Sequence, residues 1–220
     1  MAKYLGEIMN HELFTTFPGD FAVEVRGYFR TLGISAAPVV DADGCPIGFI
    51  ALSDMYEMTE DTPVEALMSS PADPIQVTAT IEDAARVMAE RGRHHLVVVD
   101  EDGRAVGYVG SLDVVRGLIG APVPHPEAFN TYDTQTGASW TKEATLSMDN
   151  VELIPDGPGV ISLVRCKPGE QDRVVWSAGS QNVRTKAIGI LSGAEPTLAH
   201  LADDLDAGVL RFRAAAVKPL

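Results

Sequence analysis

The chain uses one short pattern twice, with an offset of 59 residues. An apolar run, an acidic turn, a second apolar run and a closing aspartate occupy residues 33–54 and again residues 92–113. Five landmarks keep this offset: Gly33/Gly92, Asp41/Asp100, Gly44/Gly103, Gly48/Gly107 and Asp54/Asp113. An internal repeat of this length indicates a duplicated supersecondary unit. The chain is therefore expected to fold around two similar units.

Each copy predicts a β-hairpin. The apolar runs at 38–40 and 96–99 end at the turns Asp41-Ala-Asp-Gly and Asp100-Glu-Asp-Gly, and another apolar run follows each turn. Glycine accepts a positive φ and aspartate side chains bond their own backbone. This order is therefore typical of a strand, a tight turn and a second strand.

Helical patterns flank both hairpins. Residues 22–32 and 81–91 carry apolar side chains at helical spacing, and each run is followed by a glycine. Asp54 and Asp113 open amphipathic stretches after the hairpins, at positions where an aspartate can cap a helix. Short strands are expected before the first helix of each unit, at residues 13–17 and 75–77. Each unit thus has the order strand, helix, strand, strand, helix.

Two tandem units in which an apolar run ends in Val-Val-Asp-x-Asp-Gly-x-x-x-Gly, with a closing aspartate, resemble a CBS domain pair, or Bateman module. The resemblance covers about residues 1–120, divided into units at 1–62 and 63–120. It implies an α/β fold of tandem β-α-β-β-α repeats with two clefts between the units. It also implies association into a homodimer.

The resemblance further implies a regulatory protein that is not an enzyme and that binds an adenosine-containing ligand: AMP, ADP, ATP or an S-adenosyl compound. In nucleotide-binding CBS pairs an aspartate grips the two ribose hydroxyls, and its counterparts here are Asp54 and Asp113. An ionised carboxylate suits this role because it only accepts hydrogen bonds. Simple helix capping is the equally weighted alternative. The family tends to carry Ser or Thr three residues before this aspartate, where the present chain has Ala51 and Gly110. This difference weakens the prediction of ribose binding, although Ser111 could partly substitute.

A basic cluster accompanies the second unit. This cluster consists of Arg91, Arg93, His94 and His95 at the start of the middle strand, where Arg93 and the two imidazoles could meet phosphate groups. Salt bridges with the acidic surface are the alternative role for each residue alone. The matching positions of the first unit include Ile34 and Ala36, which could wall an adenine ring but cannot neutralise phosphate. We therefore expect two unequal sites, with the second more competent for a charged nucleotide.

The character of the chain changes after residue 120. Residues 121–145 are a proline-rich linker that continues as either an ordered arm or a mobile loop. Residues 146–220 predict a small α+β domain of order β-β-α-α-β, faintly similar to a degenerate GIY-YIG endonuclease-like fold. The two motif tyrosines of that family would fall near Ile161 and Ser177, and its arginine could be matched by Arg184 or only by Lys186, so nuclease chemistry is expected to be lost.

The charge and composition of the chain limit the classes of partner that it can bind. The net charge is −14, with −11 on residues 1–120 and −3 on residues 121–220. Such a field makes nucleic acid and anionic membranes unfavourable partners. No apolar run is long enough to span a membrane, there is no signal-peptide pattern, and two cysteines suggest a reducing cytoplasm.

Three functional hypotheses follow from the sequence. The first is a regulatory module that senses an adenine nucleotide and signals to the C-terminal domain or to a protein effector that the sequence does not identify. The second is a ligand-free scaffold that dimerises and displays residues 121–220. The third and weakest is a nucleic-acid-processing enzyme. No catalytic residue, metal site or cofactor is predicted beyond the possible adenine nucleotide.

Overall fold

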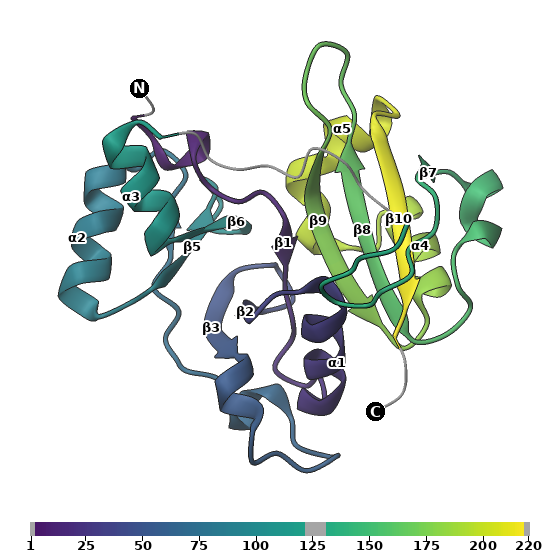
Figure 1. Ribbon diagram of the computed structural model, residues 1–220, viewed down its shortest axis with the longest axis horizontal. Helices are drawn as coiled ribbons and strands as arrows, with labels where there is room; N and C mark the ends of the chain where they lie inside the picture. Colours follow the sequence, from purple (N-terminus) through teal and green to yellow (C-terminus); the bar gives the residue numbers. More distant parts are fainter. Residues whose placement is uncertain (1–2, 122–130, 218–220) are drawn as a thin grey trace.

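The computed structural model describes residues 3–121 and 131–217. Two repeat units lie on one side of the molecule, and a C-terminal domain lies on the other (Figure 1). The first unit contains β1 (Leu13–Phe14), α1 (Ala22–Leu32), β2 (Ala36–Val40), β3 (Pro46–Ala51) and a 3-10 helix at Leu52–Met55. The second contains β4 (Ile75–Gln76), α2 (Ile81–Arg91), β5 (His95–Val99), β6 (Ala105–Gly110) and α3 (Ser111–Ile119). The predicted tandem α/β repeat is confirmed.

Two details of the first unit differ from the sequence prediction. The stretch that opens at Asp54 forms only a 3-10 turn, whereas its counterpart in the second unit is the α-helix α3. The first strand covers Leu13–Phe14 and does not continue to residue 17. The polar run at residues 58–63 follows the 3-10 turn closely, which leaves little apolar sequence to extend an amphipathic helix.

The hairpin turns form as the Asp-x-Asp-Gly sequences predict. Strand β2 pairs antiparallel with β3, and β5 pairs antiparallel with β6. The Asp41 carboxylate accepts hydrogen bonds from the backbone N–H groups of Asp43 (3.0 Å) and Cys45 (2.9 Å). Gly44 and Gly103 adopt φ values of 83° and 81°, a region that glycine enters without a steric penalty.

The segment leading into each unit packs on the other unit. Asn10 forms an antiparallel bridge with Tyr108, and Ser69 forms the equivalent bridge with Phe49. A Cβ added at Gly107 would lie 2.7 Å from the carbonyl oxygen of Asn10, and one at Gly48 would lie 2.8 Å from that of Ser69. These two glycines recur in the repeat because another backbone crosses directly over them.

The C-terminal domain is built on a five-stranded sheet of order β1-β9-β8-β10-β7. Its further elements are β7 (Ala144–Thr145), a 3-10 helix at Met148–Leu153, β8 (Gly159–Arg165), β9 (Arg173–Ser180), α4 (Val183–Leu191), a 3-10 helix at Pro196–Leu201, α5 (Ala202–Asp206) and β10 (Leu210–Ala216). The order β-β-α-α-β predicted for this region is observed from β8 to β10. Helix α4 begins at Asn182, whose side chain accepts a hydrogen bond from the Thr185 N–H (3.0 Å).

Strand β1 joins the two halves of the molecule. It pairs parallel with β9, with Leu13 opposite Trp176, and two residues later Thr16 bridges to Val39 in β2. A strand expected within the first unit therefore also completes the sheet of the C-terminal domain. The repeat half and the C-terminal domain are thus linked by main-chain hydrogen bonds as well as by side chains.

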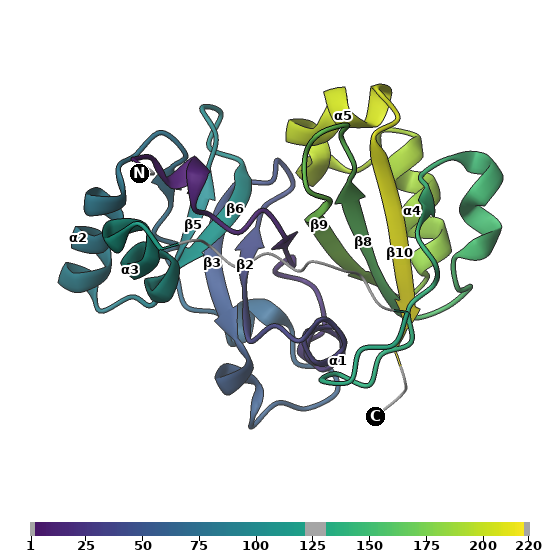
Figure 2. The ribbon, with the colours of Figure 1, turned by 45° about the horizontal axis from the view of Figure 1, so that its top comes forward.

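The two faces of the five-stranded sheet are covered differently. One face packs on α4, α5 and the 3-10 helix between them. The other face turns toward the first unit, where α1 contacts β8 and β9 (Figure 2). One hydrophobic core holds Phe29 of α1, Trp140 of the preceding arm, and Val160 and Ala215 of the sheet. The C-terminal domain therefore shares a core with the first repeat unit.

The described part of the proline-rich region, residues 131–145, is an ordered arm. Trp140 bridges to Ala215, and β7 pairs antiparallel with β10. The proline cluster itself, at residues 122–126, lies outside the described residues. Within the described chain, no helix combines the length and the apolar character needed to cross a bilayer.

Trp140→Ala should destabilise the folded protein. The Trp140 side chain is buried between α1 and the sheet, and it packs against the Arg213 guanidinium 4.2 Å away. Truncating a buried tryptophan costs about 3–5 kcal/mol. We expect a loss of this size in the free energy of unfolding measured with urea. Tyr132→Ala, at an exposed position of the same arm, is the matched control. Equal effects of the two changes would contradict the shared core.

Candidate functional site

A cavity of about 440 Å³ lies between the two repeat units and is called here the Asp54 cleft. It is lined by the start of β2, the end of β3 with the following turn, residues 69–73, and the start of β5. Its polar walls include Asp54 from the first unit and Arg93, His94 and His95 from the second. Ala36 and Phe49 provide apolar surface. Its size falls within the usual range of small-molecule sites.

The Asp54 carboxylate keeps accepting capacity that a ligand can use. Its Oδ2 accepts a hydrogen bond from the Ala51 N–H (2.8 Å), as a capping residue does. Its Oδ1 has only a long contact from the Ser53 hydroxyl (3.5 Å). A carboxylate oxygen carries two lone pairs, so Oδ1 can accept from a ligand hydroxyl. Capping and ligand binding are thus compatible in this residue.

Asp113 is more fully occupied. Its Oδ2 accepts from the Gly110 N–H (3.0 Å), and its Oδ1 lies 3.7 Å from the Arg116 guanidinium. Asp113 and Ser111 line neither the Asp54 cleft nor the second cleft described below. The Asp54 cleft therefore combines Asp54 with Arg93, His94 and His95, whereas Asp113 lies near His95 without lining this cleft.

Asp73 holds the arginines of the basic cluster. Its carboxylate accepts from the Arg93 Nε (2.9 Å) and forms a close ion pair with Arg91. Asp73 also lines the Asp54 cleft, so it fixes Arg93 at the rim and partly neutralises it. A phosphate group at this rim would either share the Arg93 guanidinium with the Asp73 carboxylate or bind beside His94. Sequence reasoning missed Asp73 because nothing near it in the chain predicts which arginines it meets.

His95 lies where the two clefts meet. Its ring stacks on Phe49, with centroids 6.2 Å apart and an interplanar angle of 14°. Burial lowers the pKa of His95 below its ordinary value, His94 adds to this, and Asp113 opposes it. The ring is therefore neutral near pH 7, which suits stacking against a flat base better than binding a phosphate.

A second cleft, of about 160 Å³, lies on the other side of His95. Ile34 and Ala36 of the first unit line it, and its polar groups include Glu12 and Tyr108. The Tyr108 hydroxyl bonds the Asn10 side-chain nitrogen (2.5 Å), and burial raises the pKa of Tyr108 to about 12. The two clefts are unequal, and the smaller one holds no arginine.

Glu12 connects the second cleft to the C-terminal domain. Its carboxylate accepts a hydrogen bond from the Ser177 hydroxyl of β9 (3.3 Å), and Ser177 in turn bonds Ser162 of β8 (2.8 Å). Burial raises the pKa of Glu12, while the positive charge of Arg213 and the Ser177 bond oppose the rise. The sequence contained no signal for this residue, because its partners lie more than 160 positions away in the chain.

The sequence model of the CBS domain family matches residues 5–59 and again residues 64–120. The chain belongs to the CBS domain family. Its two matches coincide with the repeat that forms both clefts, and together they cover half of the chain. The C-terminal domain lies outside them.

Curated relatives match the CBS pair. An uncharacterised protein of Methanopyrus kandleri is 24% identical over 119 residues, which are 51% of this chain and 61% of the relative. Two uncharacterised proteins of Methanocaldococcus jannaschii are 29% and 30% identical over 126 and 129 residues, covering 56% and 58% of this chain and 47% and 42% of those relatives. The chain thus spans about half the length of these relatives.

Solved structures of CBS pairs resemble the same half. The cytosolic domain of the Mg²⁺ channel MgtE in complex with ATP is 30% identical, with a TM-score of 0.49, and the likeness covers 51% of this chain and 48% of that one. CBSX2 in complex with AMP is 20% identical, with a TM-score of 0.48 and coverage of 54% and 98%. A CBS pair in complex with 5′-methylthioadenosine and S-adenosyl-L-methionine is 22% identical, with a TM-score of 0.48 and coverage of 53% and 96%.

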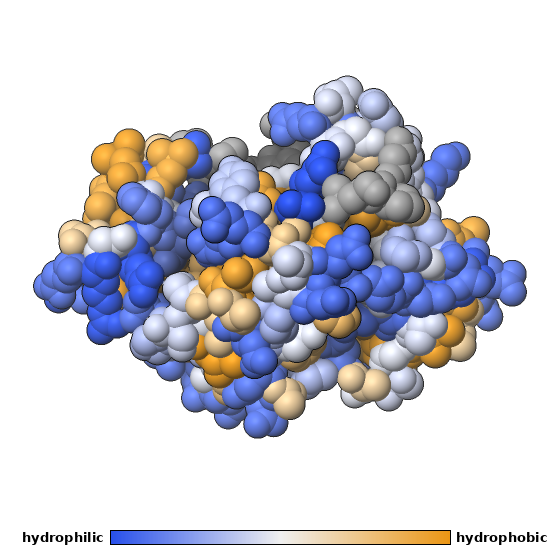
Figure 3. All heavy atoms as spheres, turned by 90° about the horizontal axis from the view of Figure 1, so that it is seen from below, coloured by the Kyte–Doolittle hydropathy of each residue, from blue (hydrophilic) through white to orange (hydrophobic). Residues whose placement is uncertain are grey.

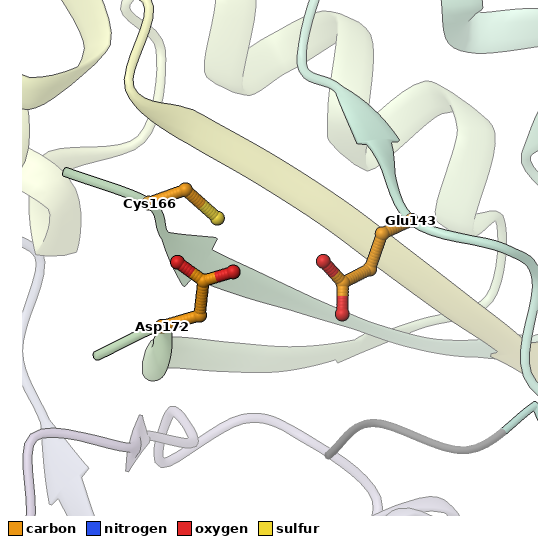
Figure 4. A group of neighbouring side chains, drawn as sticks. All are labelled: Glu143, Cys166 and Asp172. Atoms are coloured by element: carbon orange, nitrogen blue, oxygen red, sulfur yellow. The ribbon is translucent and has the colours of Figure 1, made fainter. Parts of the chain in front are cut away.

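One group outside the CBS pair has metal-ligand chemistry. Glu143, Cys166 and Asp172 place ligand atoms within 4.8 Å of one another beside the β8–β9 hairpin (Figure 4). Burial and the neighbouring Asp172 raise the pKa of the Cys166 thiol to about 11. Arg211 and Arg213 bring positive charge to the Glu143 carboxyl. We assign this group no metal role.

Glu12→Gln should change the pH dependence of stability. A raised folded-state pKa means that the folded protein binds the proton more tightly than the unfolded chain. Stability is then lost as the pH rises above about 4.5 and through the folded-state pKa. The variant lacks this loss, so its stability relative to the parent should grow with pH in urea unfolding. The exposed Glu152→Gln is the control. A Glu12→Gln difference that does not vary with pH would contradict the assignment.

Proposed function

We propose that this protein is a non-enzymatic regulatory module that binds one adenosine-containing ligand, such as AMP, ADP, ATP or an S-adenosyl compound, in the Asp54 cleft. The observation that carries the proposal is the convergence of a carboxylate with a free oxygen, a stacked neutral imidazole and a basic rim around one cavity of about 440 Å³. In this arrangement Asp54 receives the ribose hydroxyls. His95 and Phe49 offer a flat apolar wall to the adenine.

The charged group of the ligand binds near the start of β5. Arg93 has 41% of its side chain exposed, and His94 lines the same cavity. A phosphate or a carboxylate can accept charge-assisted hydrogen bonds from Arg93, in competition with Asp73. A single anionic group suits this rim better than a triphosphate, because Asp73 neutralises much of its positive charge.

The signal would pass through the strand that the two halves share. Strand β1 follows directly after Glu12 and pairs with β9, and two residues later Thr16 bridges to Val39 of the first unit. A change in the angle between the CBS units would move β1 and the Glu12–Ser177 hydrogen bond together. The C-terminal domain then presents an altered surface to a protein effector.

The substitutions Asp54→Ala and Asp113→Ala test which of the two candidate carboxylates binds the ligand. Both changes remove one helix-end cap, so their structural costs should be similar, at about 1 kcal/mol. We expect Asp54→Ala to weaken adenine-nucleotide binding at least about tenfold, the effect of losing about 1.4 kcal/mol of binding energy. Asp113→Ala should change it by less than about twofold. Calorimetry with AMP, ADP, ATP and S-adenosylmethionine measures this. Equal losses, or no heat from any ligand with the parent protein, would contradict the proposal.

The second unit also presents a surface suited to a second copy of this chain. Leu112, Val115, Leu118 and Ile119 of α3 are 58%, 50%, 40% and 71% exposed and follow helical spacing. Apolar atoms gather at the end of the molecule that carries α2 and α3 (Figure 3). A single apolar stripe can pair with itself across a two-fold axis. The counterpart of α3 in the first unit is the short 3-10 turn at Leu52–Met55, and α1, the counterpart of α2, is already covered by the sheet of the C-terminal domain.

Val115→Glu together with Ile119→Glu should convert a homodimer into a monomer. Buried acidic groups in an apolar interface lose their hydration without gaining partners. Light scattering after size-exclusion chromatography measures the mass of the particle. Tyr56→Glu, at an 80% exposed position outside the stripe, is the control. A parent protein that is monomeric at high concentration, or a double variant that stays dimeric, would refute the interface.

A ligand-free scaffold is the alternative function, and the replacement of Ser or Thr by Ala51 and Gly110 favours it. A nucleolytic role gains no support from Arg184, whose guanidinium donates to the Ile154 carbonyl oxygen (2.8 and 3.0 Å) and holds the loop before β8. Cys45 and Cys166 are both free thiols, in keeping with the proposed cytoplasmic location.

A further inference from the structure

A third cavity, of about 210 Å³, lies at the junction of the first CBS unit and the C-terminal domain. One wall comes from the turn before α1 and from α1 itself, with Asp20, Glu24 and Tyr28. The opposite wall comes from the end of β9, from α4 and from the segment after it, with Trp176, Lys186 and Glu195 among its residues. It is separate from both clefts of the CBS pair.

The polar groups of the C-terminal wall already satisfy one another. The Trp176 indole N–H donates to the Thr197 hydroxyl (3.2 Å), which donates to the Glu195 carboxylate (2.7 Å). The other oxygen of Glu195 forms a close ion pair with Lys186. The Trp176, Thr197, Glu195 and Lys186 side chains are therefore paired with one another, and the Lys186–Glu195 pair carries no net charge.

The CBS wall is different. Tyr28 is only 7% exposed, and none of the described residues hydrogen-bonds its hydroxyl, which keeps some contact with solvent through the cavity. Its ring lies against the backbone of Gly179, where an added Cβ would come within 2.2 Å of it, so the ring is fixed in the cavity wall. A ligand is a natural partner for this hydroxyl.

Negative charge on the CBS wall is also uncompensated. Among the described residues neither Asp20 nor Glu24 forms a salt bridge, although Asp20 accepts hydrogen bonds from Thr16 and Phe17. Burial raises the pKa of Tyr28, and the nearby charges of Glu24 and Asp20 raise it further. The cavity therefore has a negative potential on one side.

Three aromatic side chains complete the lining: Phe17, Tyr28 and Trp176. Aromatic faces attract organic cations, and carboxylates beside them add to the attraction. A metal ion fits less well. In the described parts of the chain only Glu143, Cys166 and Asp172 bring three ligand atoms together, so the carboxylates of this cavity are too widely spread to hold one ion jointly.

We propose that the junction cavity is a binding site for a small organic cation, an alkylammonium or guanidinium compound. The cationic group lies between Glu24, Asp20 and the aromatic rings, and the Tyr28 hydroxyl accepts a hydrogen bond from it or donates one to a polar group elsewhere on the ligand. Since the ligand touches α1 on one side and β9 and α4 on the other, it stabilises the docking of the C-terminal domain on the CBS pair.

Calorimetry and thermal unfolding of the full chain with tetramethylammonium, choline, putrescine and agmatine test the site, with equal concentrations of sodium chloride as the reference. At least one of these cations should bind saturably and raise the unfolding temperature. Preference for the quaternary ions shows that the aromatic rings dominate, and preference for the amines shows that the carboxylates do. Either preference supports the proposal, and no saturable binding by any of the four overturns it.

Two substitutions test whether the cation binds in this cavity. Glu24→Gln should weaken it about tenfold, as expected for the loss of one partly buried ion pair, and Tyr28→Phe should weaken it severalfold while keeping the ring that packs on Gly179. Glu82→Gln removes the same charge from the first turn of α2, outside the cavity, and should leave binding unchanged. Equal weakening by Glu24→Gln and Glu82→Gln would show a general charge effect and overturn the site. Adenine-nucleotide titrations of the same variants report separately on the Asp54 cleft.

Discussion

The pairing of β1 with β9 is the constraint on which the arrangement of the molecule depends. Leu13 and Phe14 give the C-terminal sheet its edge strand, and two residues later the same chain bridges to β2. A main-chain ladder cannot slide without breaking several hydrogen bonds at once. The C-terminal domain is therefore held in register with the first CBS unit, and the shared core around Trp140 and Phe29 fills the angle between them.

This docking breaks the symmetry that the duplication created. Both units have equivalent hairpins, crossing lead-in segments and glycines under the crossing backbone. Yet α1 packs against the C-terminal sheet, whereas its counterpart α2 packs with α3, which leaves an apolar stripe exposed. The second cleft, next to the sheet, is small and holds Glu12, while the Asp54 cleft on the other side is larger and carries the basic residues. One cleft is thus open to a ligand, and the other borders the C-terminal domain.

The sequence predicted the structural features that depend on residues close together in the chain. Turns at Gly44 and Gly103, helix ends at Gly33 and Gly92, and the β8–β9 hairpin all follow from residues close together in the chain. It could not predict which distant elements meet. The Asp73–Arg93 pair, the Glu12–Ser177 bond and the β1–β9 pairing each join segments whose separation leaves no periodic signal. The 3-10 turn at Leu52–Met55 is shorter than its counterpart α3 because the polar run at residues 58–63 leaves little apolar sequence to extend it.

Charge explains why such a module can be selective. The repeat half carries most of the negative charge, so anions approach it against an unfavourable field except at the rim of the Asp54 cleft. There Asp73 holds Arg93 in place while taking part of its charge, which favours ligands whose anionic group matches this fixed geometry. The junction cavity uses the same acidic field in the opposite sense, because Glu24 and Asp20 favour a cation. Phe14 of β1 lines the second cleft, and Thr15 and Phe17 just after it line the junction cavity, so one segment of the chain borders both cavities.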